Sequence, residues 1–121
     1  MTTKSEADHR VDDNALVKKA VRASASKLGL KLATLSEVTG VRREVFSREQ
    51  ETLNRKQLES CLLVIRATRS LSALVGGDED QMKHWINTPT RAFNAPPKEL
   101  MKSTRGLVRT VQYLDAMRAK I

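Results

Sequence analysis

Aromatic side chains are scarce in this sequence: they make up 3% of its 121 residues, although 40% of the residues are hydrophobic. A core of stacked rings is therefore excluded, and the core must be built from Leu, Val, Ala and Met. A chain of this length buries only about two thirds of its unfolded surface when it folds. We therefore expect dimerisation or a partner protein to add to its stability.

Cysteine occurs once, which excludes an internal disulfide and is typical of proteins from a reducing compartment. Cys61 lies among leucines at helical spacing, so we expect a buried thiol of the core and not a nucleophile. No apolar run approaches the roughly 18 residues of a membrane-spanning helix. The first residues also lack the apolar segment of a signal peptide. These absences predict a cytoplasmic protein with no membrane partner.

The residue sets of enzyme active sites are missing as well. The two histidines, His9 and His84, have no companions at metal-ligand spacing, and the sequence has neither a Gly-rich phosphate loop nor a Ser/His/Asp set. No carboxylate pair lies in an apolar setting that would raise a pKa. The acids Asp78, Glu79 and Asp80 fit the start of a helix, where the dipole favours negative charge. We therefore expect no enzyme activity, cofactor, metal or small-molecule substrate.

Positive charge, in contrast, is abundant. The net charge is +8 and the isoelectric point is about 10.1, which favours nucleic acid or an acidic protein surface as a partner. A generically basic soluble protein is the alternative. The distribution of charge favours a specific partner, because the segment between Ala15 and Ser36 holds five basic residues and no acid. The five are Lys18, Lys19, Arg22, Lys27 and Lys31.

The apolar pattern is helical, and no segment alternates as a strand would, so the sequence predicts an all-α fold. Residues 1–13 are polar and aperiodic, and we expect them to form a disordered tail. Asn14 or Asp13 is a suitable N-cap for a first helix, which should end at Gly29. Two short helices are expected next, over residues 32–39 and from Arg42 to Gln50.

The longest expected helix begins at Asn54 as N-cap and stops before Gly76-Gly77. Its apolar positions form two overlapping stripes, so it should be buried on two sides as the spine of the fold. Part of the second stripe, with Val64, Leu71 and Val75 as candidates, is expected to form a two-fold contact in a homodimer.

Three further helices are expected in the last third of the chain. Asp78 or Asp80 caps the first, which Thr88-Pro89 terminates, Pro97 begins the second, and Ser103 or Thr104 opens the last. The chain is accordingly divided into a tail (1–13), a helix-turn-helix region (14–53), a central long helix (54–77) and a C-terminal domain (78–121).

Residues 32–48 match the helix-turn-helix DNA-binding unit. Leu35 and Val38 can face the core, Ser36 is small where the two helices cross, and Gly40 provides the left-handed backbone of the turn. An ordinary corner between two helices is the alternative. Arginine suits the guanine edge, and serine can reach phosphate or base. The residues expected to contact operator DNA are Arg42, Arg43, Ser47 and Arg48, with Lys31 beside them.

Three acids accompany these arginines. Glu44, Glu49 and Glu51 bring negative charge toward a phosphate backbone, and Glu49 stands where an apolar residue normally anchors the recognition helix. We therefore expect much of the DNA affinity to come from the acid-free first helix and from dimerisation.

A set of residues at particular spacings distinguishes the C-terminal part: Trp85-Ile-Asn-Thr-Pro89, Ala92-Phe93, Pro97-Lys-Glu-Leu-Met101, Ser103, Gly106 and Val111-Gln-Tyr-Leu114. This set resembles the C-terminal domain of Xre/MbcA/ParS-type antitoxins, which follows an Xre-like helix-turn-helix in that family. The resemblance covers residues 15–121. One departure is that Asn94-Ala95 precede Pro96, where the family often has a glycine pair.

The resemblance implies a function. Such antitoxins neutralise RES-domain toxins, which consume NAD or transfer parts of it, typically by obstructing the active site. They tend to be dimeric and to repress their own operon. The sequence therefore predicts an antitoxin that binds a cognate RES-domain toxin and operator DNA. A stand-alone helix-turn-helix regulator without a toxin partner is the alternative.

Two groups of residues are expected to contact the toxin. Trp85 and Pro89 lie in the resembling segment, although packing within the core is the alternative for Trp85. Arg118, Lys120 and Ile121 are expected to enter the active site, with Ile121 in a base-binding pocket and the two cations at its rim. The alternative is that Ile121 packs on the core of this chain and that the surface over residues 85–114 holds the toxin.

Overall fold

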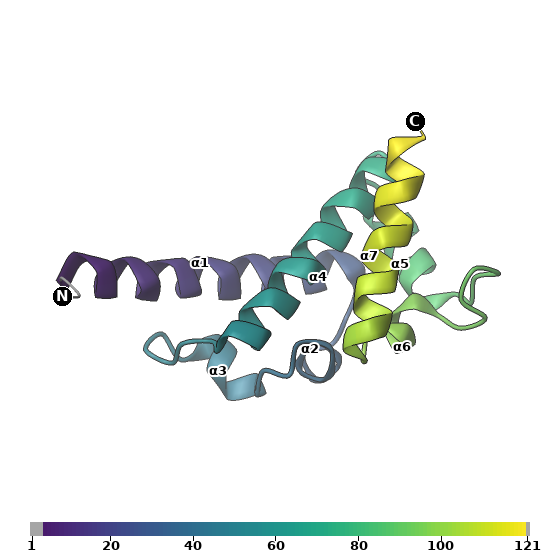
Figure 1. The fold of residues 1–121 in the computed structure, drawn as a ribbon. Coiled ribbons are helices and arrows are strands. Elements are labelled where there is room, and N and C mark those ends of the chain that lie inside the picture. Colours follow the sequence, from purple (N-terminus) through teal and green to yellow (C-terminus); the bar gives the residue numbers. More distant parts are fainter. Residues whose placement is uncertain (1–3, 121) are drawn as a thin grey trace.

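Seven helices and no strand occur in the computed structural model over residues 4–120, the part of the chain that the structure describes (Figure 1). Side chains are described for residues 13–120. The expected all-α fold is confirmed. The helices are α1 (Lys4–Leu28), α2 (Leu32–Thr39), α3 (Arg43–Ser47), α4 (Arg55–Leu74), α5 (Glu79–Asn87), α6 (Pro97–Leu100) and α7 (Thr104–Ala119).

The central element is α4, which packs against α1 and against α7 (Figure 1). Its start is fixed by the expected N-cap: the Asn54 side chain accepts a hydrogen bond of 2.8 Å from the Gln57 backbone N–H. The Gln57 side chain in turn accepts one of 3.0 Å from the Asn54 N–H. This reciprocal capping box satisfies two donors that the helix itself leaves unpaired. Because α4 packs against both α1 and α7, the interpretation of α4 as the spine of the fold is confirmed.

The expected two-fold contact through Val64, Leu71 and Val75 is wrong. Val64 and Leu71 are 0% and 2% exposed, and Val75 packs against the same core. Because α1 and α7 cover α4 from two sides, the stripe with Val64 and Leu71 is buried within one chain. The large hydrophobic residues that remain exposed include Leu16 on α1, at 65%, and Leu62 on α4, at 48%.

Helix α1 begins earlier than the sequence pattern indicates. Residues 4–13, expected to belong to a disordered tail, continue the helix in the structure, whereas residues 1–3 lie outside the described residues. No glycine or proline interrupts the sequence before Gly29, so nothing in it stops the helix from extending. Asn14 is therefore not a cap. Its Oδ1 instead accepts a hydrogen bond of 2.7 Å from the Leu53 N–H.

Two helices of the C-terminal half, α5 and α7, begin at expected N-cap residues. Asp78 caps α5 by accepting from the backbone of Asp80 and Gln81, and the Ser103 hydroxyl caps α7 by accepting from the Gly106 N–H at 3.0 Å. A Cβ at Gly106 would collide with the Leu100 carbonyl, so glycine permits the close approach of the backbones of α6 and α7 there.

Cys61 is fully buried on α4, and this burial raises the pKa of its thiol to about 12. The thiolate, which is the nucleophilic form, is thus negligible at neutral pH. The prediction of a core thiol is confirmed. Over the described residues, no helix is long and apolar enough to cross a membrane.

Candidate functional site

The unit of α2, turn and α3 has the packing that the sequence predicts. Gly40 takes a left-handed φ of +72°, and its N–H donates to the Ser36 carbonyl at the end of α2. Leu35, Val41 and Phe46 are all buried beneath the unit. The Ser36 hydroxyl donates to the Val41 carbonyl, which fixes the path of the turn.

Helix α3 is shorter than the expected span of Arg42 to Gln50. It covers five residues, with Arg42 as an extended N-cap residue and Arg48 as an extended C-cap residue. The chain then runs through a loop to α4, and in it Glu49 is exposed. Leu53, at the end of this loop, is 8% exposed and packs in the core.

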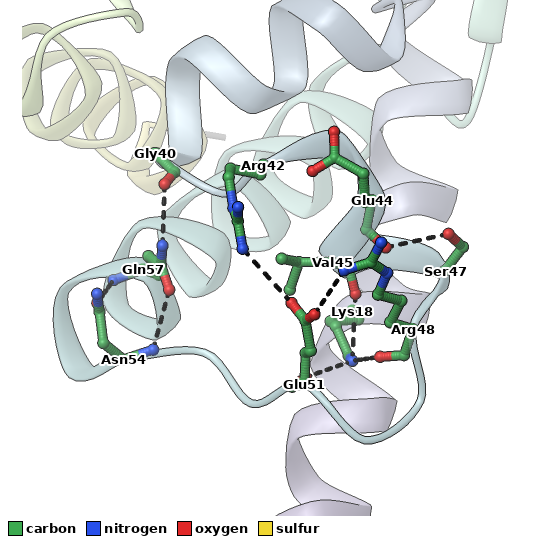
Figure 2. Close-up of polar contacts among 10 residues, drawn as sticks. All are labelled: Lys18, Gly40, Arg42, Glu44, Val45, Ser47, Arg48, Glu51, Asn54 and Gln57. Carbon is green, nitrogen blue, oxygen red and sulfur yellow. Dashed lines mark hydrogen bonds and ion pairs between the residues drawn. The ribbon is translucent and has the colours of Figure 1, made fainter.

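The arginines of this unit differ in whether they form an ion pair. Arg48 donates to the Glu51 carboxylate at 2.8 Å, and Arg42 lies 3.9 Å from the other oxygen of that group (Figure 2). The hydrogen bond from Arg48 lowers the pKa of Glu51, so this carboxylate stays ionised at neutral pH. Arg43 is exposed, and the described residues form no ion pair with it.

The two other expected DNA contacts also lie at this surface. Ser47 is exposed at the end of α3, where its hydroxyl donates to the Glu44 carbonyl at 3.1 Å. Lys31 is exposed at the N-cap position of α2. A cation beside the N-terminus of a helix suits a phosphate group, because the first backbone N–H groups of the helix also face the anion.

Of the basic residues of α1, Lys18 does not join the others at the surface, which corrects the expectation that the whole acid-free helix contributes to DNA affinity. Lys18 is 3% exposed and donates to three backbone carbonyls, those of Val45, Arg48 and Glu51. It is therefore unavailable to DNA. The sequence analysis did not predict this role. The available signal was that no glycine follows α3 to end the helix, so its last carbonyls need another partner.

Three aromatic rings gather on the C-terminal half. Trp85 stacks on Tyr113 with a centroid distance of 6.3 Å, and Phe93 meets Tyr113 edge to face at 5.1 Å. The Arg109 guanidinium lies 5.2 Å from the Phe93 centroid and donates to the Ala92 carbonyl at 2.8 Å. These contacts tie the loop between α5 and α6 to α7. Both Trp85 and Tyr113 remain partly exposed, so the cluster presents aromatic surface.

The loop between α5 and α6 shows how this chain accommodates Asn94-Ala95 where the family often has a glycine pair. Asn94 has a φ of +56°, a left-handed conformation that asparagine adopts more readily than most residues other than glycine. Asparagine therefore fills a backbone position for which a glycine would be the simplest choice.

The residues expected to bind the toxin lie on two faces. Pro89 is exposed just after α5, near Trp85 in sequence. Arg118 and Lys120 are exposed at the far end of α7, and Ile121 lies outside the described residues. Successive residues turn about 100° around a helix axis, so Arg118 is about 140° from Tyr113 around α7. The structure thus does not bring these residues together.

Two family models match the chain. Residues 7–66 match the antitoxin Xre-like helix-turn-helix domain, and residues 70–120 match the antitoxin Xre/MbcA/ParS C-terminal toxin-binding domain. The chain belongs to the Xre/MbcA/ParS-type antitoxins. No curated protein gives a match. The antitoxin combines a helix-turn-helix with a toxin-binding domain, as the resemblance implied.

The two parts of the antitoxin share α4. The first match ends at residue 66 and the second begins at residue 70, both within this one continuous helix. Asp115 of α7 pairs with Arg66 at 2.7 Å and accepts from the Ser70 hydroxyl at 2.9 Å. The toxin-binding part of the antitoxin is therefore attached to the helix that follows the recognition unit.

Proposed function

We propose that this antitoxin neutralises a RES-domain toxin, one that hydrolyses NAD or transfers part of it, by obstructing the toxin's active site. The match of residues 70–120 to a toxin-binding domain carries this proposal. The aromatic cluster around Trp85 supports it, because partly exposed aromatic rings beside an arginine are typical of protein interfaces. A stand-alone regulator would not need such a domain.

The first test is whether a neighbouring reading frame encodes a RES-domain protein, and the second is co-production of the antitoxin with that protein. Cells that make the toxin alone are expected to lose NAD, and cells that make both proteins are expected to keep it. The two proteins should also purify as one complex. An Arg43→Ala variant is the matched control and should protect NAD fully, since Arg43 lies in the other part of the chain. Persistent loss of NAD despite equal amounts of antitoxin would favour the stand-alone regulator.

The second proposed activity is repression of the antitoxin's own operon. The match of residues 7–66 to a helix-turn-helix domain supports DNA binding. We propose that Arg43, Arg42 and Arg48 read or approach bases, with Ser47 and Lys31 on the phosphate backbone. All five are exposed on the α2–α3 unit or directly before it.

We further propose that the antitoxin is a homodimer through a groove between α1, α4 and α7. Leu16 and Leu62 line this groove together with Arg69 and Asp115. A two-fold contact joins a surface to its own copy, so apolar area can meet the same apolar area, and charges of both signs can pair across the axis. A dimer would also present two recognition helices to two half-sites.

The doubly substituted variant Leu16→Glu, Leu62→Glu is expected to be monomeric, because four carboxylates would be forced together across the two-fold axis. Light scattering at tens of micromolar measures the mass. Leu32→Glu is the matched control: Leu32 is 40% exposed on α2, outside the groove, and its variant should remain dimeric. A monomeric mass for the unsubstituted antitoxin would refute the dimer altogether.

A further inference from the structure

The ammonium group of Lys18 is enclosed between α1 and the segment that follows the recognition helix (Figure 2). It donates to the carbonyls of Arg48 at 2.6 Å, Glu51 at 2.7 Å and Val45 at 3.3 Å. A lysine ammonium has three donors, and all three are used here. A buried cation is tolerated only where its donors are satisfied. These three hydrogen bonds therefore stabilise the ammonium group in its buried position between α1 and the end of α3.

Helix α3 depends on contacts from outside itself. It has five residues, far fewer than an isolated helix needs for stability. No side chain caps its N-terminal end at Arg42, and its C-cap residue, Arg48, is extended and not left-handed. The last carbonyls of a helix need partners. Lys18 supplies one to the Val45 carbonyl, which also accepts from the Arg48 N–H, and one to the carbonyl of the C-cap residue Arg48. It does so from α1, some thirty residues earlier in the chain.

The Lys18 ammonium also fixes the position of Glu51, the acid that pairs with Arg48 and Arg42. Lys18 holds the main chain of Glu51, and the side chain of Glu51 pairs with Arg48 and Arg42. Asn14, one turn before Lys18 on α1, accepts from the Leu53 N–H at 2.7 Å. Helix α1 therefore holds both the end of α3 and the loop that leads to α4.

We propose that Lys18 is a positioning residue for operator recognition: it touches no DNA, but it fixes the recognition helix through the carbonyls of Val45 and Arg48. This inference rests on the proposed DNA binding. It predicts that removal of a buried charge, which lies beneath the DNA surface and not on it, weakens specific binding without removing a phosphate contact.

The test compares Lys18→Met with Lys19→Met, which removes the same charge from an exposed neighbour on α1. Operator affinity is measured over a series of salt concentrations. A residue that neutralises a phosphate contributes about 0.9 to the slope of log affinity against log salt. We expect Lys18→Met to lose about tenfold or more in affinity with an unchanged slope. Wild-type affinity, or a slope reduced by about one unit, would overturn the proposal.

A second measurement does not require DNA. Amide hydrogen exchange in residues 43–53 is expected to be faster in Lys18→Met, with unchanged exchange in α7 and unchanged toxin binding. Unchanged exchange in residues 43–53 would overturn the proposal. If the unsubstituted antitoxin itself binds operator and random DNA equally, DNA recognition fails as a function. The exchange measurement still decides whether Lys18 holds α3.

Should Lys18→Met not fold, Lys18→Arg takes its place. Arginine keeps the charge but presents its donors in a rigid plane that does not match three converging carbonyls. Reduced operator affinity with an unchanged salt slope would support the positioning role. Affinity and exchange equal to those of the unsubstituted antitoxin would contradict it.

Discussion

An antitoxin that lacks residues 118–121 is expected to bind its toxin and yet leave NAD consumption running. The deletion removes Arg118 and Lys120, which we propose to lie at the rim of the toxin's active site, together with Ile121, which we propose to occupy a base-binding pocket. Binding should survive, with a loss of about tenfold or less, about 1.4 kcal/mol, because the surface around Trp85 remains. The measurement is NAD turnover by the purified complex.

The fold should tolerate this deletion. Leu114 is the last residue of α7 that is fully buried, and residues 116–120 are exposed. Circular dichroism and thermal unfolding of the free antitoxin provide the control. Trp85→Ala is the converse variant, expected to weaken the complex while any complex that forms stays inactive. Full suppression of NAD turnover by the shortened antitoxin would show that another segment blocks the active site.

Replacement of Arg43 by alanine is expected to weaken operator binding by about 1–3 kcal/mol, or roughly 5- to 150-fold. Of the three arginines that we propose to contact DNA, Arg43 is the one that does not pair with Glu51, so its guanidinium can meet a base edge. Affinity for random DNA should fall much less, because non-specific binding depends on phosphate contacts. Fluorescence anisotropy with an operator duplex and a scrambled duplex measures both. Equal losses on the two duplexes would exclude a base contact by Arg43.

The Glu51→Gln variant is measured with the same two duplexes. It releases Arg48 and Arg42 from their carboxylate partner, so affinity for both duplexes should rise and its salt dependence should become steeper. The variant keeps the main-chain carbonyl that Lys18 binds, so α3 should remain in place. Weaker binding by Glu51→Gln would instead indicate that the carboxylate orients the arginines for recognition.

The helix-turn-helix could be predicted from the sequence because its constraints are local. Gly40 must adopt a positive φ, and the small Ser36 and the apolar Leu35 are fixed at short spacings around it. The caps at Asn54, Asp78 and Ser103 are local in the same sense, since each bonds within three residues of itself. The C-terminal domain could be recognised because its Trp, Pro and Gly residues recur at characteristic spacings.

Contacts between distant segments could not be predicted in this way. Lys18 has the same charge as Lys19 and Arg22, and only the packing of α1 against α3 decides which of them is buried. The stripe with Val64 and Leu71 indicated correctly that α4 has two apolar sides, but the sequence did not reveal that α7 covers one of them. A pattern of polarity gives the face that is buried and does not identify the segment that buries it.

The continuity of α4 across the boundary of the two matched domains restricts how such a protein can diversify. One residue inserted between positions 66 and 70 would rotate everything after it by about 100° and advance it by about 1.5 Å. Seven inserted residues would nearly restore the rotation but displace the following part by about 10 Å. Either change would also separate Arg66 from Asp115. New operator preferences are therefore more readily acquired by substitution on α3 than by recombination of whole domains at this junction.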